Sequence, residues 1–150
     1  MANTYTALHF HIVFSTKNRE PWLTAENEER ICKYLGGIAR DKGLRALQVG
    51  GCCNHVHVLL SMPPTIAVSK AVQLLKGASS HWIHKTFTDL SAFAWQDGYG
   101  AFTVGLSQIA DTKRYIENQR EHHQGKTFQE EYLAFLRKHG VEYDERYVWG

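Results

Sequence analysis

The sequence predicts an α+β fold of the ferredoxin-like type: a split βαβ antiparallel sheet with helices on one face and a C-terminal helical extension. Two observations support this prediction. The hydrophobic periodicity runs in the order strand, helix, strand, strand, helix, strand, and then two more helices. The chain has 150 residues, 43% of them hydrophobic and 21% charged, as expected for one globular domain with one core. We therefore expect a single domain over residues 1–150.

The chain begins with an expected strand and helix. Residues 5–15 alternate between an apolar face and a second face that carries His9 and His11, which is typical of a strand. Thr24 is a good N-cap for a helix whose apolar residues recur at helical spacing, and Gly43 is expected to end that helix.

A hairpin, a helix and a fourth strand should follow. Residues 44–50 and 54–61 have the composition of two strands, with a tight turn expected at residues 50–52, where two glycines stand. The next helix is expected to begin near Thr65. Residues 99–104 are the fourth expected strand.

Two further helices complete the predicted fold. Ser107 is expected to cap a helix over about 107–123, and Thr127 with Glu130 makes a capping box for the next one. The extension over about 127–150 ends in aromatic residues, which we expect to pack on the body of the domain.

Several features bear on where the protein acts. No apolar run is long enough to span a bilayer, and the N-terminus lacks the pattern of a secretory signal. Cys32, Cys52 and Cys53 are an odd set with two adjacent members, which makes a poor disulfide framework. We therefore expect a cytoplasmic protein with no membrane partner.

A histidine pair is the first candidate for chemistry. His55 and His57 flank Val56 on the third expected strand, so both imidazoles lie on one face, about 7 Å apart at the backbone. Such side chains can converge on one metal ion. Such a pair on a strand is more often two ordinary surface or hydrogen-bonded histidines, so the spacing alone leaves both interpretations open.

A tyrosine and a glutamine form the second candidate. Tyr115 and Gln119 are four residues apart and share one face of the expected helix, which has little apolar surface. A polar stripe of this kind indicates either a functional face or a solvated face with a surface tyrosine.

Together these residues resemble the HUH-type single-tyrosine transposases, which combine a His-hydrophobic-His motif with one catalytic tyrosine. The end of the chain is similar to the REP-associated branch in particular. The resemblance covers nearly the whole sequence. It rests on HIVFSTK at 11–17, NHVHVLLSMPP at 54–64, LKG at 75–77, WQDGY at 95–99, RYIENQ at 114–119, FQEEY at 128–132 and EYDERYVW at 142–149.

The resemblance implies roles for the candidate residues. His55, His57 and Gln119 would bind a divalent metal, Mg²⁺ or Mn²⁺, and Tyr115 would be the nucleophile. The implied activity is metal-dependent cleavage and rejoining of single-stranded or hairpin DNA, as in DNA transposition, through a covalent 5′-phosphotyrosine. Residues 1–150 would then form one HUH-type transposase domain. Two neutral imidazoles and an amide fit this chemistry because they leave the metal its full charge for the phosphate.

Basic and histidine side chains around this centre are further candidates. The formal net charge is only +2, so DNA binding would depend on local patches. His9 or His11 could orient a metal ligand from the neighbouring strand, although a hydrogen-bonded strand histidine is as good an interpretation. The candidate phosphate contacts, each of which is compatible with a solvated face, are Lys17, Arg19, Lys70, Lys76, Lys113, Arg114 and Arg120.

The sequence also leads to a prediction about assembly. Tyr115 lies on a helix entered through Gly105, and a glycine junction can direct that helix away from its own sheet. The resemblance adds that many such transposases are homodimers that pair the histidines of one chain with the tyrosine of the other. We expect a homodimer, with a monomer as the alternative if the C-terminal extension covers the dimer surface.

Two rival functions remain open. The first is a small zinc-binding module built from Cys52, Cys53, His55 and His57. The second is a non-catalytic nucleic-acid-binding domain of ferredoxin-like fold, although its sheet should carry aromatic residues where the histidines stand.

Overall fold

The computed structural model, which describes residues 3–150, contains one four-stranded antiparallel sheet with the strand order β2-β3-β1-β4. The two central strands, β1 and β3, pair along their whole length. This is the predicted ferredoxin-like α+β fold. The strands are β1 (His9–Ser15), β2 (Arg45–Cys52), β3 (His55–Ser61) and β4 (Gly100–Thr103).

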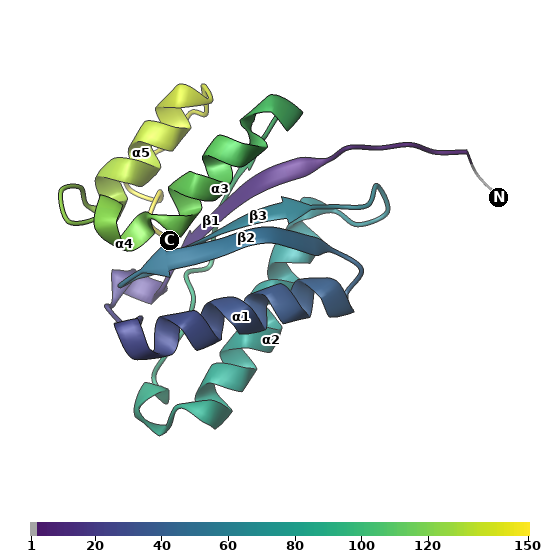
Figure 1. Cartoon of the computed structure of the whole chain (residues 1–150). Helices are drawn as coiled ribbons and strands as arrows, with labels where there is room; N and C mark the ends of the chain where they lie inside the picture. Colours follow the sequence, from purple (N-terminus) through teal and green to yellow (C-terminus); the bar gives the residue numbers. More distant parts are fainter. Residues whose placement is uncertain (1–2) are drawn as a thin grey trace.

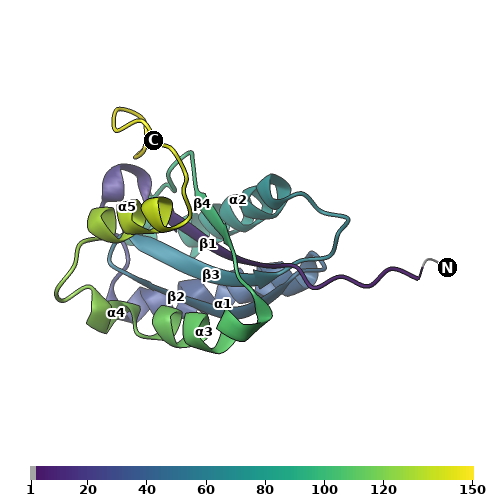
Figure 2. The same cartoon turned by 90° about the horizontal axis from the view of Figure 1, so that it is seen from above.

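Helices cover both faces of this sheet (Figures 1 and 2). On one face lie α1 (Ala25–Asp41) and α2 (Val68–Thr86). On the other lie α3 (Ile109–Glu117), α4 (Gln119–His122) and α5 (Phe128–Lys138). Short 3₁₀ turns are η1 (Lys17–Arg19), η2 (Thr88–Leu90) and η3 (Leu106–Gln108). The C-terminal extension therefore covers the sheet face that the βαβ helices leave free.

Two hydrophobic clusters follow from the alternation along β1. Ile12 and Phe14 belong to the larger cluster between the sheet and helices α1 and α2. Val13 points the other way and packs with Phe102 of β4 and Tyr132 of α5. The predicted division of this strand into two faces is confirmed.

None of the helices among residues 3–150 is apolar over enough of its length to traverse a bilayer.

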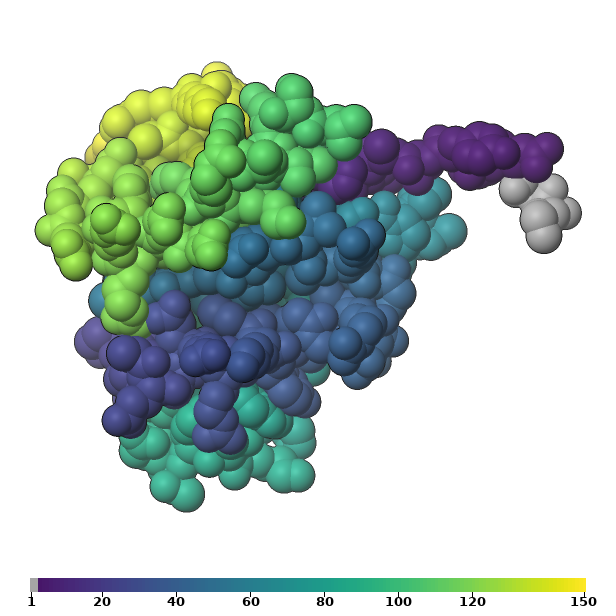
Figure 3. Space-filling model, in the orientation of Figure 1, coloured from purple at the N-terminus to yellow at the C-terminus, as the bar shows by residue number. Residues whose placement is uncertain are grey.

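The first strand is shorter than the predicted 5–15. It begins at His9, which pairs with Ser61 at the end of β3. Tyr5 is 91% exposed, because the pairing of β1 begins only at His9 with β3 and at Phe10 with β4. Figure 3 shows this N-terminal segment standing out from the body of the molecule.

The predicted turn at residues 50–52 is wrong by two residues. Gly50 and Gly51 lie within β2, and the chain turns at Cys53, whose φ is +63°. The reason is a close approach by α3: a Cβ added to Gly50 would lie 2.3 Å from the backbone oxygen of Ile116. The glycine thus lets α3 pack directly on its own sheet.

The predicted helix 107–123 is also divided. Ser107 lies inside η3 instead of capping a helix, and α3 begins only at Ile109. The helix breaks at Asn118 (φ −97°, ψ 22°), just before the buried Gln119. Helix α2 begins at Val68, three residues after the predicted start at Thr65.

The other predicted helix ends agree with the structure. The Thr24 side chain accepts a hydrogen bond from the backbone N–H of Asn27, and the Thr127 side chain accepts one from the backbone N–H of Glu130. Gly43 has a φ of +79°, which suits the left-handed end of α1.

Candidate metal centre and catalytic tyrosine

The histidine pair on β3 points into the interface between the sheet and the C-terminal helices. His55 is 1% exposed and His57 is fully buried, while Val56 and Val58 face the larger hydrophobic cluster on the other side. The period of two along the strand places both imidazoles on one face, as predicted. They are therefore interior, hydrogen-bonded residues of a polar site, and of the alternative interpretation only the surface location is wrong.

Gln119 faces the same site from α4. Its Oε1 lies 3.0 Å from Nε2 of His55, and its Nε2 donates to the backbone oxygen of Tyr115 at 3.3 Å. The side chain is 1% exposed. The break in the helix at Asn118 therefore precedes the residue that reaches His55.

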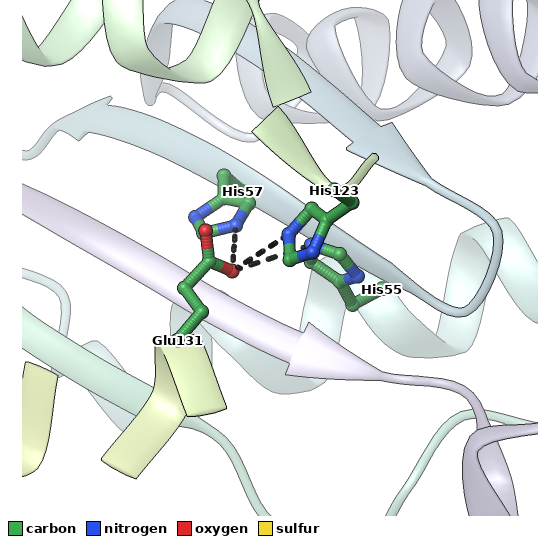
Figure 4. A group of neighbouring side chains, drawn as sticks. All are labelled: His55, His57, His123 and Glu131. Carbon is green, nitrogen blue, oxygen red and sulfur yellow. Dashed lines mark hydrogen bonds and ion pairs between the residues drawn. The ribbon is translucent and has the colours of Figure 1, made fainter. Parts of the chain in front are cut away.

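Glu131 of α5 joins this site, although the sequence analysis gave it no role. Its Oε1 lies 3.0 Å from Nε2 of His57, 3.2 Å from Nε2 of His123 and 3.4 Å from Nε2 of His55. Figure 4 shows the carboxylate and the three imidazoles turned toward one another. The ligand atoms of these residues, which we call the His–Glu group (His55, His57, His123 and Glu131), all lie within 4.8 Å of one another. The group is thus of a kind that can hold a metal ion.

The hydrogen bonds behind the imidazoles bear on which nitrogen carries the proton. Nδ1 of His123 faces the backbone oxygen of Lys126, which can only accept, so this nitrogen carries the proton. In the neutral ring, Nε2 of His123 then presents a lone pair to Oε1 of Gln119 at 3.0 Å as well as to Glu131. Lone pairs that face one another repel unless a cation, either a proton or a metal ion, lies between them. The donor geometry therefore fits a bound cation.

His11 supports the group from β1, the neighbouring strand. Its Nε2 lies 2.7 Å from Nδ1 of His57, and both side chains are buried. Asn54 contacts His55 in a similar way, because its Oδ1 lies 3.0 Å from Nδ1 of the His55 ring. Contacts of this kind fix the orientation of a ligand imidazole. Of the two histidines predicted on β1, His11 contacts a member of the group and the partly buried His9 has no recorded side-chain bond.

Burial and charge set the protonation states in the group. Burial lowers the pKa of His57 to about 4, against the opposing influence of Glu131. Burial alone would raise the pKa of Glu131, but hydrogen bonds with His123, His55 and His57 hold it below its usual value. A neutral imidazole and an ionised carboxylate are the forms that bind metal ions.

Tyr115 completes the site from α3. Its hydroxyl donates to Oε2 of Glu131, and Nε2 of His122 lies 3.4 Å away. The ring centroid is 5.8 Å from that of His57 in the same chain. Burial, followed by the hydrogen bond to Glu131, raises the pKa of Tyr115, so its hydroxyl is protonated unless further positive charge is near.

Comparison with known proteins identifies the family. The family model described as "Transposase IS200 like" matches residues 4–119, which is most of the chain. The chain belongs to the IS200-like transposase family. It is 32% identical over 126 residues to the transposase for insertion sequence element IS200 of Salmonella typhimurium, covering 81% of this chain and 82% of that protein. This family transposes DNA, and the predicted enzyme class and tyrosine-transposase resemblance are confirmed.

Further relatives of this IS200-like transposase agree in sequence and fold. It is 29% identical to the ISDra2 transposase TnpA of Deinococcus radiodurans, over 76% of this chain and 85% of that one. A solved structure assigned as a D. radiodurans transposase superposes with a TM-score of 0.67 at 28% identity, covering 80% and 96% of the two chains. A REP-associated tyrosine transposase bound to a REP hairpin superposes with a TM-score of 0.55, covering 79% and 70%, and at 14% identity it shows a shared fold.

The residues that sequence reasoning missed lie beyond the family match. His123 and Glu131 follow Gln119, where that match ends. A signal for Glu131 was present, because it stands three residues after Phe128 and directly before Tyr132, on the buried face of α5.

Four of the seven basic residues predicted to contact DNA have a side-chain partner within the chain. Lys17, Lys70 and Lys113 are exposed, and Lys70 lies on α2, across the sheet from Tyr115. Burial lowers the pKa of Lys76 to about 8. The paired ones are Arg19 with the Trp149 oxygen, Lys76 with the Gln96 and Gly98 oxygens, Arg114 with Asp111, and Arg120 with Glu28.

The cysteines of the rival zinc module contact each other. Sγ of Cys52 lies 3.0 Å from Sγ of Cys53, and neither residue belongs to the His–Glu group. Among residues 3–150 the metal-binding geometry therefore involves histidines and a glutamate without sulfur.

Proposed function

We propose that this IS200-like transposase cuts and rejoins single-stranded DNA through a covalent bond between Tyr115 and a 5′-phosphate, beside a divalent metal ion. One observation carries the proposal: Glu131 accepts a hydrogen bond from the Tyr115 hydroxyl through Oε2, while its Oε1 faces the three histidines. The predicted nucleophile and the candidate metal ligands thus share one carboxylate.

The residues that would hold the ion are His55, His57 and Gln119, with His123 and Glu131 added to the set inferred from the sequence. A bound Mg²⁺ or Mn²⁺ would polarise the scissile phosphate and add the positive charge that favours a tyrosinate. Because imidazole nitrogens outnumber oxygens in the set, Mn²⁺ is the better match of the two.

The proposed cleavage step transfers the 5′-phosphate of the DNA to Tyr115. The Tyr115 oxygen bonds to phosphorus while the bond from phosphorus to the 3′-oxygen breaks. The hydroxyl proton passes to Oε2 of Glu131, its existing hydrogen-bond acceptor, and then to the leaving 3′-oxygen. The products are a 5′-phosphotyrosine and a free 3′-hydroxyl. Attack by a 3′-hydroxyl on this phosphotyrosine reverses the step and rejoins DNA without an external energy source.

The proposed substrate is a single strand flanking a hairpin. An unpaired strand can bend its phosphate toward the recessed Tyr115, whereas stacking in a duplex resists that bend. The similar REP-associated transposase is bound to a REP hairpin, which makes hairpin DNA the first substrate to test.

The proposed site is formed within one chain. This is supported by the Tyr115–Glu131 contact and by the packing of α3 on its own sheet over Gly50. The homodimer stays a prediction about assembly. Mixing Tyr115→Phe with His55→Ala protein tests it: recovered activity after subunit exchange indicates a site shared between chains, and no recovery with exchange shown independently indicates a site within one chain.

The proposed function is tested with a library of labelled hairpin DNAs that have randomised single-stranded flanks. Incubation with Mn²⁺ should give a protein–DNA adduct that survives a denaturing gel. EDTA, a fully duplex library and the variant Tyr115→Phe should each abolish the adduct. Tyr143→Phe is the matched control, because it removes a tyrosine hydroxyl from the C-terminal tail and should leave the adduct unchanged. An adduct of undiminished yield in Tyr115→Phe would overturn the proposal.

A further inference from the structure

A cavity of about 350 Å³ lies beside Tyr115, between β4, α3 and α5. Figure 2 shows α3 and α5 on either side of this region, with the sheet behind it. Tyr115 belongs both to the cavity wall and to the contacts around Glu131, so the cavity adjoins the proposed reaction centre. Phe102, Phe135 and His139 line it with aromatic rings, and Gln108, Thr112 and Lys138 add polar groups.

One wall of the cavity consists of parallel aromatic rings. Phe102 and Phe135 are stacked, with ring centroids 5.4 Å apart and an angle of 18° between the planes. His139 continues the stack next to Phe135, at 6.3 Å and 27°. The Tyr115 ring stands nearly perpendicular to Phe135, at 82°. Flat surfaces of this kind suit a planar ring that stacks or packs edge to face.

The rest of the rim is polar and includes a positive charge. Gln108, Thr112 and Lys138 line the cavity from η3, α3 and α5, and Lys138 is exposed. Amide and hydroxyl groups can hydrogen-bond the edge of a base, and a lysine next to them can pair with a backbone phosphate. Asp111, whose carboxylate would repel a phosphate, is already paired with Arg114.

We propose that this cavity binds one unstacked nucleobase of the DNA strand, next to the phosphate that Tyr115 attacks. The proposal rests on the proposed function, and it names the substrate feature that the site reads. The volume is near the lower end of ligand pockets, which run from about 300 to 1,000 Å³, so it fits one base better than two stacked ones. Binding there would hold the flanking nucleotide while its phosphate faces Tyr115, and the polar rim would make cleavage depend on which base it is.

The first part of the test reads the sequence of strands that become attached to the wild-type protein from the randomised hairpin library. The inference predicts a strong base preference at one position next to the attached phosphate. A random distribution at both neighbouring positions, with adducts present, would overturn the inference and leave the proposed function standing. Absence of any adduct overturns the proposed function and this inference with it.

The second part uses a recovered strand with one base at a time replaced by an abasic site. Binding to the Tyr115→Phe protein is measured by fluorescence anisotropy, so that no cleavage intervenes. Loss of one stacked base should weaken binding roughly tenfold at a single position next to the scissile phosphate. Equal affinity for every abasic strand contradicts the inference, and this result needs no cavity variant that could misfold.

A third measurement assigns the effect to the cavity. In the Phe135→Ala background the difference in affinity between the intact and the abasic strand should shrink, because one ring of the stacked pair is gone. Thr112→Val, at the rim, should keep the stacking effect but relax the base preference. The control Tyr147→Ala removes an aromatic ring that is 71% exposed on the C-terminal tail and should change neither. A full abasic effect in folded Phe135→Ala protein would locate the base elsewhere.

Discussion

Strand β3 and helix α5 contribute to the same site in different ways. On β3 the alternation of the backbone alone directs His55 and His57 to one face. On α5 the same kind of reasoning assigns Phe128 and Tyr132 to the buried face, and Glu131 lies between them as a buried carboxylate. The strand donors fall within the family match, whereas the α5 donor lies outside it. A histidine pair inside the family match is therefore completed here by a carboxylate from a segment beyond that match.

Glu131→Gln should have the largest effect of the variants that compare β3 with α5, because it should weaken metal binding most. The amide keeps the shape but removes the charge beside three imidazoles and Tyr115. If Glu131 of α5 binds the ion together with the histidines of β3, the Mn²⁺ affinity of Glu131→Gln should fall by roughly 100-fold or more. Titration followed by electron paramagnetic resonance measures this affinity. Adduct formation should fall with it at limiting Mn²⁺.

Glu130→Gln is the matched control for this variant. It makes the same charge change one residue earlier on α5, where the carboxylate is exposed and accepts a hydrogen bond from the Thr127 hydroxyl. Its Mn²⁺ affinity should stay within about twofold of the wild type, since exposed charges at this distance are screened. If both variants lose the same amount of Mn²⁺ affinity, the loss is not specific to the Glu131 carboxylate, and Glu131 is not a ligand of the ion.

The next largest effect is expected from a change that disturbs the packing of α3 onto β2. Gly50→Ala places a methyl group against the backbone oxygen of Ile116, so α3 has to move away from the sheet. We expect a loss of about 1–3 kcal/mol in the free energy of unfolding, measured by urea denaturation. Because Tyr115 precedes Ile116 on α3, adduct yield should fall as well.

Gly36→Ala in α1 is the comparison for that measurement. A Cβ at Gly36 meets no atom within 4 Å, and the residue lies in a helix interior. This variant should gain roughly 0.5–1 kcal/mol, as is usual for glycine to alanine in helices. A Gly50→Ala protein as stable as Gly36→Ala would show that α3 is not held against β2.

The smallest expected effect concerns His11, which contacts the group only through His57. His11→Ala should weaken Mn²⁺ binding roughly tenfold, as is typical for residues that orient a metal ligand. His9→Ala, two residues away on the same strand, should leave Mn²⁺ affinity unchanged. A loss as large as that of Glu131→Gln would instead indicate direct ligation by His11.

These contrasts mark what the sequence can predict. The fold order, the two faces of β1 and the direction of His55 and His57 all depend on local periodicity and were predicted. The close approach of α3 to Gly50 was not predicted. Glycine is also common in turns, and only the position of α3 shows that this glycine lies in a strand against a helix. The local pattern puts Glu131 on the buried face of α5, but it does not encode how the chain after Gln119 folds back over the sheet and so brings His123 and Glu131 to His55 and His57.

The central claim is that Tyr115 bonds to DNA beside a centre completed by Glu131. The most direct test digests the denatured protein–DNA adduct with nuclease and protease and locates the remaining nucleotide by mass spectrometry. The account predicts a nucleotide joined through its 5′-phosphate to the peptide containing Tyr115, formed only when Mn²⁺ or Mg²⁺ is present. A nucleotide on any other residue, with the Tyr115 peptide unmodified, would contradict it.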